Sequence, residues 1–338
     1  MEDRIALTGA SGFIGTHLVN ILADAGSQVL NLDVKPPKLN AHRPYWSKVD
    51  VTNSADVIAS LSAFKPTQVI HLAARTDTLS DDVDKYRVNW IGAENLSEAC
   101  VELSVPRFVH VSTQYVHAVE LEPRSDVEFS PFTAYGESKV KSEKLVRDVL
   151  DGSSVTWTIV RPTNIWGAYH PRYADEFWKV LSRGQYLHPA LAKSPIRAYG
   201  YVENVAWQLR GLLELDDPRV HEHVFYVGDR PLRLDDWVDT FSRLLRGAPA
   251  RRVPLSVLKA IAAVGDSAKL LGLPAPLTRS RLRNMVESSA APMGPIHDLL
   301  GDPPFSLNDG VCRTGTWLLE LGFELHNESL STRRAGQM

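Results

Sequence analysis

Cysteine and net charge are both scarce in this sequence of 338 residues. Only Cys100 and Cys312 occur, far apart and in no metal-binding or redox spacing, which argues against a disulfide framework and fits a reducing compartment. The formal net charge of −3 gives no electrostatic signature for nucleic acid, and no polybasic tail indicates an anionic membrane. We therefore expect a cytoplasmic protein with no nucleic-acid partner.

Long apolar runs are missing as well. The first run, residues 5–7, is far too short for the apolar core of a signal peptide. The longest, roughly residues 253–277, is interrupted by Lys259, Asp266 and Lys269, whereas a membrane-spanning helix needs about 20 mostly uncharged residues. We expect no stable membrane insertion and an amphipathic surface or core helix here, with a membrane-interface helix as the alternative.

Metal-ligand spacings are absent although the chain has 11 histidines. His221 and His223 precede a predicted strand, so alternation places both on one face. We interpret them as a solvated strand edge, with a metal site as the alternative, and we predict no metal.

Short apolar runs alternate with helical patterns in the first half of the chain. We expect strands near 4–8, 28–32, 69–72, 107–111 and 155–160, with helices near 12–25, 53–63, 85–103 and 135–150. Continuous apolar strands separated by helices indicate a parallel sheet covered on both faces. The sequence therefore predicts an α/β fold of the Rossmann type, a doubly wound parallel sheet that binds its ligand at the carboxyl ends of the strands.

The alternation breaks near Trp166, where proline and aromatic residues become dense. Residues 224–227 resemble one more strand that returns to the sheet, and later segments near 234–246, 254–272 and 277–287 have helical patterns. We predict a Rossmann domain of 1–165 with about 202–230 returning to it, a smaller, mainly helical portion of 166–201 and 231–326, and a disordered tail of 327–338.

A glycine-rich turn joins the first strand to the first helix. Gly9, Gly12 and Gly15 let the backbone turn tightly, approach a pyrophosphate and pack the helix on the sheet. The spacing, G-x-x-G-x-x-G, is a variant of the dinucleotide fingerprint, and a helix N-terminus follows to supply N–H donors for phosphates. The strand before and the helix after favour a dinucleotide site over the alternative, an ordinary glycine-rich surface turn.

Asp33 stands eighteen residues after Gly15, at the end of the second strand. Its carboxylate can accept hydrogen bonds from the adenosine ribose and would repel a 2′-phosphate. We therefore predict NAD as the cofactor, while Lys35 and Lys38 keep NADP as an alternative.

Tyr135 and Lys139 share one face of a predicted helix, and no other tyrosine in the chain has a lysine four residues later. An ammonium group nearby favours the phenolate and lowers the pKa of the tyrosine, which is otherwise near 10. With the Thr113 hydroxyl, the pair forms a proton-transfer set for alcohol and ketone chemistry beside a nicotinamide. An ordinary amphipathic helix is the alternative for the pair taken alone.

Several further motifs carry a family resemblance. They are the turn at 8–15, Asp33, Asp50-Val51, the V-I-H-L-A-A run at 69–74, Asn89, Ser112-Thr113, the Y-x-x-S-K motif ending at Lys139, R-P-T-N at 161–164 and the R-x-Y-x-Y-V-x-N-V run at 197–205. In combination they resemble the extended short-chain dehydrogenase/reductases of the NAD-dependent epimerase/dehydratase family, whose best-known members act on nucleotide-sugars. The resemblance is good to about residue 245 and thin afterwards.

The resemblance implies roles for individual residues and a homodimer that pairs the helices at 85–103 and 136–150. Cofactor contacts are implied for Phe13, Ile14, Asp50, Val51, Leu72, Ala73, Ala74, Asn89, Tyr135 and Lys139, besides the glycines and Asp33. Thr113, Tyr135 and Lys139 match the catalytic triad, and Thr113 and Asn164 are implied to contact substrate. Arg197 matches a diphosphate-binding arginine, with a surface arginine as the alternative.

Departures from the family pattern narrow the reaction. Gln114 and Tyr115 replace the Asp-Glu pair with which the 4,6-dehydratases eliminate water, and neither cysteine matches the one used by 3,5-epimerising reductases. The sequence thus favours an NAD-dependent epimerase or reductase acting at C4 of a nucleotide-sugar. Two alternatives stay open: oxidation of a hydrophobic alcohol, because residues 252–285 are similar to the tails of 3β-hydroxysteroid dehydrogenase-like proteins, and a non-catalytic NAD-binding scaffold.

Overall fold

The computed structural model describes residues 3–118, 121–215, 218–273, 275, 277–289 and 291–326. The chain divides into two compact units. Unit 1 comprises Met1–Ile165, Val202–Asp229 and Ala291–Pro304, and unit 2 comprises Trp166–Tyr201, Arg230–Ala290 and Phe305–Met338. The predicted tail at 327–338 lies outside the described residues.

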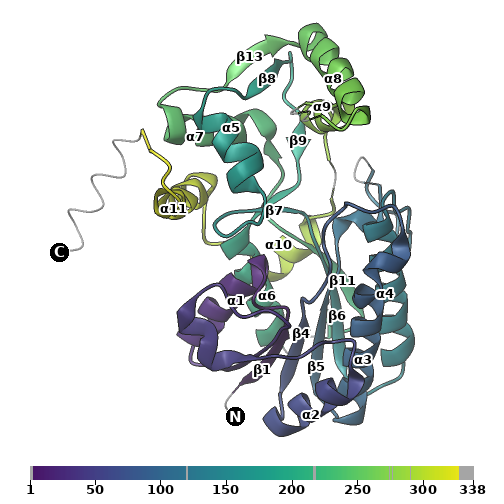
Figure 1. Ribbon diagram of the computed structural model, residues 1–338. Helices are drawn as coiled ribbons and strands as arrows, with labels where there is room; N and C mark the ends of the chain where they lie inside the picture. The colour runs from purple at the N-terminus through teal and green to yellow at the C-terminus, as the bar shows by residue number, and fades with distance from the viewer. Residues whose placement is uncertain are drawn as a thin grey trace, which may run out of the picture. The chain divides into compact units, whose positions relative to one another are not determined.

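A seven-stranded parallel sheet forms the centre of unit 1 (Figure 1). Its strands are β1 (Arg4–Thr8), β2 (Gln28–Leu32), β3 (Trp46–Ser47), β4 (Gln68–His71), β5 (Arg107–Val111), β6 (Thr156–Pro162) and β11 (His223–Val227). Their order across the sheet is β11-β6-β5-β4-β1-β2-β3. The order reverses between β1 and β4, and ligands of such sheets bind at this switch point. The predicted Rossmann-type fold is confirmed.

Helices cover both faces of the sheet. They are α1 (Phe13–Asp24), α2 (Ser54–Phe64), α3 (Val88–Glu102), α4 (Ala134–Leu150), α6 (Val202–Glu214) and α10 (Gly294–Leu300). Figure 1 shows α1 beside α6 on one face and α2, α3 and α4 on the other. No helix in the described part of the chain is both long enough and apolar enough to cross a lipid bilayer.

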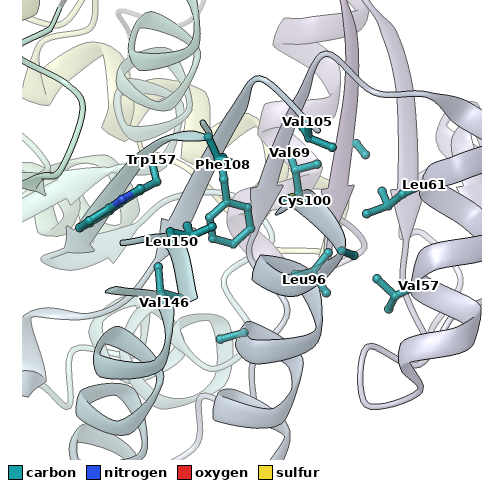
Figure 2. Packing of buried hydrophobic residues seen from close by; sticks show 14 of the residues in the cluster. Val57, Leu61, Val69, Leu96, Cys100, Val105, Phe108, Val146, Leu150 and Trp157 are labelled. Atoms are coloured by element: carbon teal, nitrogen blue, oxygen red, sulfur yellow. The ribbon is translucent and has the colours of Figure 1, made fainter. Parts of the chain in front are cut away.

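A core of aliphatic and aromatic side chains joins the sheet to α2, α3 and α4 (Figure 2). Alternate residues of β4, β5 and β6 contribute Val69, Phe108 and Trp157, and successive turns of the helices contribute residues such as Leu96. Cys100 lies in this core, and burial raises the pKa of its thiol far above the usual range. Its role is packing.

Unit 2 is smaller and mainly helical, as expected. Its helices are α5 (Lys179–Ser182), α7 (Leu234–Arg246), α8 (Leu255–Leu270), α9 (Arg279–Val286) and α11 (Leu307–Glu320). Its short strands are β8 (Leu187–Ala190), β9 (Ile196–Arg197), β10 (Tyr199–Tyr201), β12 (Leu232–Arg233) and β13 (Arg251–Pro254), and β7 (Asn164–Trp166) crosses the boundary between the units.

One segment departs from the predicted division. Residues 291–304 were expected in the second portion, but they belong to unit 1 because α10 packs on β11 and α6. Leu300 lies against Gly211 of α6, where an added Cβ would stand 3.0 Å from a Leu300 methyl carbon. The sequence analysis predicts no helix at 294–300, so both α10 and its place in unit 1 are findings of the structure.

Candidate active site

The carboxyl ends of β1 and β4 are held against each other at the switch point. The Thr8 hydroxyl lies 2.7 Å from His71 Nδ1 and accepts a 3.2 Å hydrogen bond from the Ala73 backbone N–H. Gly9 has a φ of +69°, and a Cβ there would stand 2.5 Å from Ala73 Cα. Only glycine therefore permits this approach, which brings the glycine turn beside the segment that follows β4.

Asp33 fixes the same turn from the end of β2. Its two carboxylate oxygens accept hydrogen bonds from the backbone N–H groups of Ser11, at 3.1 Å, and Lys35, at 2.9 Å. Each oxygen retains a further acceptor position for a ribose hydroxyl. The next helix, α1, begins at Phe13 without a side-chain cap or an acidic residue in its first turn. The N-terminus of α1 thus suits an anion, and the residues present fit a dinucleotide pyrophosphate.

Tyr135 opens α4 directly beside Thr113. Thr133 caps the helix by accepting the Gly136 N–H at 3.0 Å, and a Cβ at Gly136 would stand 2.3 Å from the Tyr115 carbonyl oxygen. The helix can therefore begin against the turn that carries Thr113. The Thr113 hydroxyl lies near the phenol of Tyr135 and favours its ionised form, and both side chains are buried. The structure brings the two predicted proton-transfer groups together.

The pKa of Tyr135 differs from the sequence expectation. Burial raises it to about 12, and the nearby Thr113 hydroxyl opposes that rise. Lys139 was expected to lower it, but its amine donates instead to the Val111 carbonyl oxygen at 2.8 Å and lies 3.5 Å from His110 Nε2. The helical spacing is as predicted, but the local contacts direct the ammonium toward the end of β5.

Lys139 is itself strongly perturbed. Only 1% of its surface is exposed. Burial lowers its pKa to about 8, while the nearby carboxylate of Glu143 acts in the opposite direction. The imidazoles of His71 and His110 stack below it with their centroids 5.4 Å apart. Burial and then the charge of Lys139 lower the pKa of His71 to about 3, so this imidazole is neutral at physiological pH.

A buried ion pair, which the sequence reasoning missed, ties α4 to the sheet. Arg161 on β6 donates to both carboxylate oxygens of Glu143, from Nε at 3.0 Å and from Nη2 at 2.7 Å. Both side chains are fully buried. Ser112, directly before Thr113, donates to the same carboxylate at 2.5 Å. The spacing Lys139-x-x-x-Glu143 was the available signal, because it places the carboxylate on the same helical face as Tyr135 and Lys139.

Asn89 supports the site from α3. Its amide donates to the Ser138 hydroxyl at 2.8 Å and to the Arg75 carbonyl at 3.1 Å, and its oxygen accepts the Arg75 N–H at 2.7 Å. The segment after β4, with Leu72, Ala73 and Ala74, is thereby joined to α4. Ser138 was quoted in the sequence motif without a role, and the structure shows it as this link.

Other predicted residues occupy varied positions. Asp50 accepts hydrogen bonds from the N–H and hydroxyl of Thr52, and Val51 is part of the core. Asn164 accepts a 3.3 Å hydrogen bond from the Tyr115 hydroxyl. Arg197 belongs to unit 2, where it is buried, donates to the Glu287 carbonyl at 2.9 Å and has no partner for its Nε among the described residues. Across those residues, no three histidine, cysteine, aspartate or glutamate side chains gather as metal ligands.

The ion pair yields a stability prediction. Glu143→Gln leaves a buried guanidinium without a countercharge, so we expect the free energy of unfolding to fall by about 3–5 kcal/mol in urea denaturation. The matched control on the same helix is Glu137→Gln, which removes an exposed pair with Lys141. This substitution is expected to change the free energy of unfolding by about 0.5 kcal/mol or less. Equal effects of the two substitutions would contradict a structural role for the buried pair.

Lys139 yields a pH prediction. Its folded pKa, about 8, lies below the ordinary lysine value of 10.5, so between these values the unfolded chain holds a proton that the folded chain has released. Stability therefore rises with pH in this window. Relative to Lys139→Met, we expect wild type to gain about 2 kcal/mol of unfolding free energy between about pH 8 and about pH 10. Lys141→Met is the exposed control, and parallel pH curves for wild type and Lys139→Met would refute the prediction.

Comparison with known proteins places this geometry in a family. The chain is 31% identical over 177 residues to a 3-beta-hydroxysteroid dehydrogenase from Mycolicibacterium neoaurum, a match that covers 48% of each chain, so the chain spans about half the length of that relative. It is 26% identical over 238 residues to a UDP-glucose 4-epimerase from Vibrio cholerae, covering 68% of this chain and 71% of the relative.

The fold is shared with solved structures. A UDP-glucuronic acid 4-epimerase from Bacillus cereus, solved in complex with UDP-glucuronic acid and NAD, matches with a TM-score of 0.71 at 19% identity. The match covers 94% of this chain and 99% of that one. The family model of the NAD-dependent epimerase/dehydratase family matches residues 5–228, which is most of the chain. The chain therefore belongs to the NAD-dependent epimerase/dehydratase family, the extended short-chain dehydrogenase/reductase type.

Proposed function

We propose that this protein is an NAD-dependent epimerase or oxidoreductase that acts at C4 of a nucleotide-sugar. The observation that carries the proposal is the buried pair of Thr113 and Tyr135 at the carboxyl edge of the sheet, together with the anion-receiving end of α1. Proton-transfer groups and a dinucleotide-binding turn are the two parts that alcohol and ketone chemistry requires. Both are present in unit 1.

The cofactor would be held by residues that follow the four strands β1 to β4. The glycine turn with Phe13 and Ile14 would receive the pyrophosphate, Asp33 the adenosine ribose, Asp50 and Val51 the adenine, and Leu72, Ala73 and Ala74 would lie along the dinucleotide with Asn89 behind them. Bound NAD would supply the hydride acceptor and one positive charge.

Tyr135 would exchange the proton of the reacting substrate oxygen, and Thr113 would hydrogen-bond the same oxygen. A phenol whose pKa is about 12 is almost entirely protonated at neutral pH. A nearby cation must therefore favour the phenolate before Tyr135 can accept a proton. Lys139 is one turn away on the same helix. In this proposal, its amine holds the ribose side of the cofactor and contributes positive charge to the pocket.

The substrate class rests on relatives and on two side chains. The names of the Vibrio cholerae relative and the Bacillus cereus structure specify UDP-sugars. Asn164 would contact the sugar, and the family resemblance assigns the diphosphate to Arg197. Epimerisation or net reduction would use the same residues. Tightly retained NAD with no net change in NADH would identify an epimerase.

A second candidate is oxidation of a hydrophobic alcohol. The similarity to the Mycolicibacterium neoaurum dehydrogenase favours it. The same Thr113 and Tyr135 would serve, because the proton transfer is identical. Sugar substrates are our first choice since the comparison structures with bound UDP-sugar share the fold over nearly the whole chain.

Removal of one hydroxyl tests the chemistry. Tyr135→Phe is expected to lower kcat by about 10²- to 10⁴-fold because it removes the proton-transfer group, while NAD affinity stays near the wild-type value. Turnover would be measured against a panel of UDP-, GDP- and dTDP-sugars together with sterol and flavanol alcohols. The control is Tyr45→Phe, at a half-buried tyrosine elsewhere in unit 1.

The outcomes separate the candidate functions. Turnover of a sugar that Tyr135→Phe abolishes supports the proposal, and turnover of an alcohol in place of every sugar selects the second candidate. If cellular function is unchanged in Tyr135→Phe, the third possibility, an NAD-binding scaffold, replaces both.

Cofactor choice has its own test at Asp33. Asp33→Asn keeps an oxygen that can accept the Ser11 N–H but removes the charge that repels a 2′-phosphate. We expect the preference for NAD over NADP, measured as the ratio of dissociation constants by calorimetry, to fall by about ten-fold or more. Asp24→Asn, at the exposed far end of α1, is the control, and an unchanged ratio in Asp33→Asn would contradict the assignment.

A homodimer and a cytoplasmic location remain predictions from the sequence.

A further inference from the structure

An exposed apolar ridge lies on unit 2. Six of the 14 exposed large hydrophobic side chains in the described part of the chain fall between residues 257 and 273. We define the apolar ridge as Val257, Ile261, Val264, Leu270, Leu271 and Leu273. Leu270 and Leu271 are 89% and 77% exposed. An apolar cluster of this kind on a water-facing surface indicates an interaction site.

The ridge is a second apolar face of α8. The first face is already packed: Leu258 and Ala262 are fully buried with Leu282 of α9, which lies beside α8 in unit 2 (Figure 1). The chain just before α9 also lies against α8, because a Cβ at Gly265 would overlap the Leu277 carbonyl oxygen. The exposed side chains therefore do not belong to the small core that α8 shares with α9.

The shape of the ridge disfavours a single partner helix. Successive helical residues are rotated by about 100°, so Leu270 and Leu271 point in clearly different directions. Val257, Ile261 and Val264 follow one side of α8, and Leu273 lies beyond its end. One helix could cover that side but not Leu270 and Leu273 as well. A fluid apolar phase can surround all six.

The segment that carries the ridge is positively charged, although the whole chain carries −3. Residues 255–289 contain five cations, Lys259, Lys269, Arg279, Arg281 and Arg283, and only two carboxylates, Asp266 and Glu287. The three arginines form surface ion pairs of 3.6–3.8 Å with Asp266, Glu176 and Glu287. Exposed pairs of this kind are weak, so lipid phosphates can replace the carboxylates.

The same charge argues against a second copy of the chain. A twofold dimer places the same patch of both subunits face to face, which would bring two positive patches together. An anionic lipid surface can instead bury the leucines at the edge of its acyl chains and bind the cations with its negative headgroups, as amphipathic interfacial helices require.

We propose that the apolar ridge docks unit 2 on the surface of an anionic lipid bilayer. The leucines enter the boundary between headgroups and acyl chains, and the lysines and arginines of residues 255–289 contact lipid phosphates. No helix crosses the bilayer in this arrangement. The proposal does not depend on the reaction assigned to unit 1.

The test is sedimentation of the full-length chain with vesicles. Wild type is expected to sediment with phosphatidylcholine vesicles that contain about one third phosphatidylglycerol, more weakly with pure phosphatidylcholine, and less at high salt. Leu270→Ser/Leu271→Ser/Leu273→Ser is expected to lower the partition coefficient at least about ten-fold. The control Leu319→Ser/Leu321→Ser, at exposed leucines of another part of unit 2, is expected to bind as wild type.

A charge variant tests the second half of the proposal. Lys259→Gln/Lys269→Gln is expected to lower binding to the anionic vesicles by roughly ten-fold and to leave binding to pure phosphatidylcholine unchanged. All substituted side chains are exposed, and circular dichroism would verify that each variant is folded.

Three results would overturn the proposal. Wild type would remain in the supernatant with both kinds of vesicle, or the triple-serine variant would sediment as wild type does. In the third case, light scattering would show a dimer that the triple-serine variant converts to a monomer while vesicles bind neither protein, and the ridge would then be a contact between two copies.

Discussion

The buried ion pair of Glu143 and Arg161 is the constraint on which the arrangement of the candidate site depends. Its bidentate geometry fixes α4 on β6, and the bond from Ser112 fixes the end of β5 to the same carboxylate. Thr113 follows Ser112 directly, and Tyr135 and Lys139 precede Glu143 by two turns and one turn. A charged pair far from water thus sets the relative positions of all three proposed catalytic groups.

Burial gives this site its electrostatic character. The same low-polarity surroundings raise the pKa of Tyr135, lower that of Lys139 and keep His71 neutral. Each shift favours the uncharged form of the side chain, so a charge added to the pocket would change these pKa values. The positive charge of a bound nicotinamide ring would interact strongly with these groups, because little water is present to screen it. The proposed chemistry therefore depends on desolvation as much as on the identity of the side chains.

The two units differ in which kinds of side chain they bury and which they expose to water. In unit 1, several polar groups near the strand ends are buried and paired, as the links from Asn89 to Ser138 and Arg75 illustrate. In unit 2, α8 leaves apolar side chains in contact with water. If the ridge binds lipid, the protein would work near a membrane surface, a setting that suits the second candidate substrate, a hydrophobic alcohol.

The sequence by itself determined the fold class and the chemistry-bearing motifs. Periodic apolar runs, the turn at Gly9 to Gly15 and the pair Tyr135 and Lys139 are local patterns, and local backbone preferences suffice to interpret them. Tertiary structure alone decided the partner of Lys139, the rise in the pKa of Tyr135, the pairing of Glu143 with Arg161 and the inclusion of α10 in unit 1. These features join residues that are distant along the chain or depend on how much water each group loses. Residue spacing in a single sequence predicts neither the long-range contacts nor the loss of water, because both arise only when the elements pack.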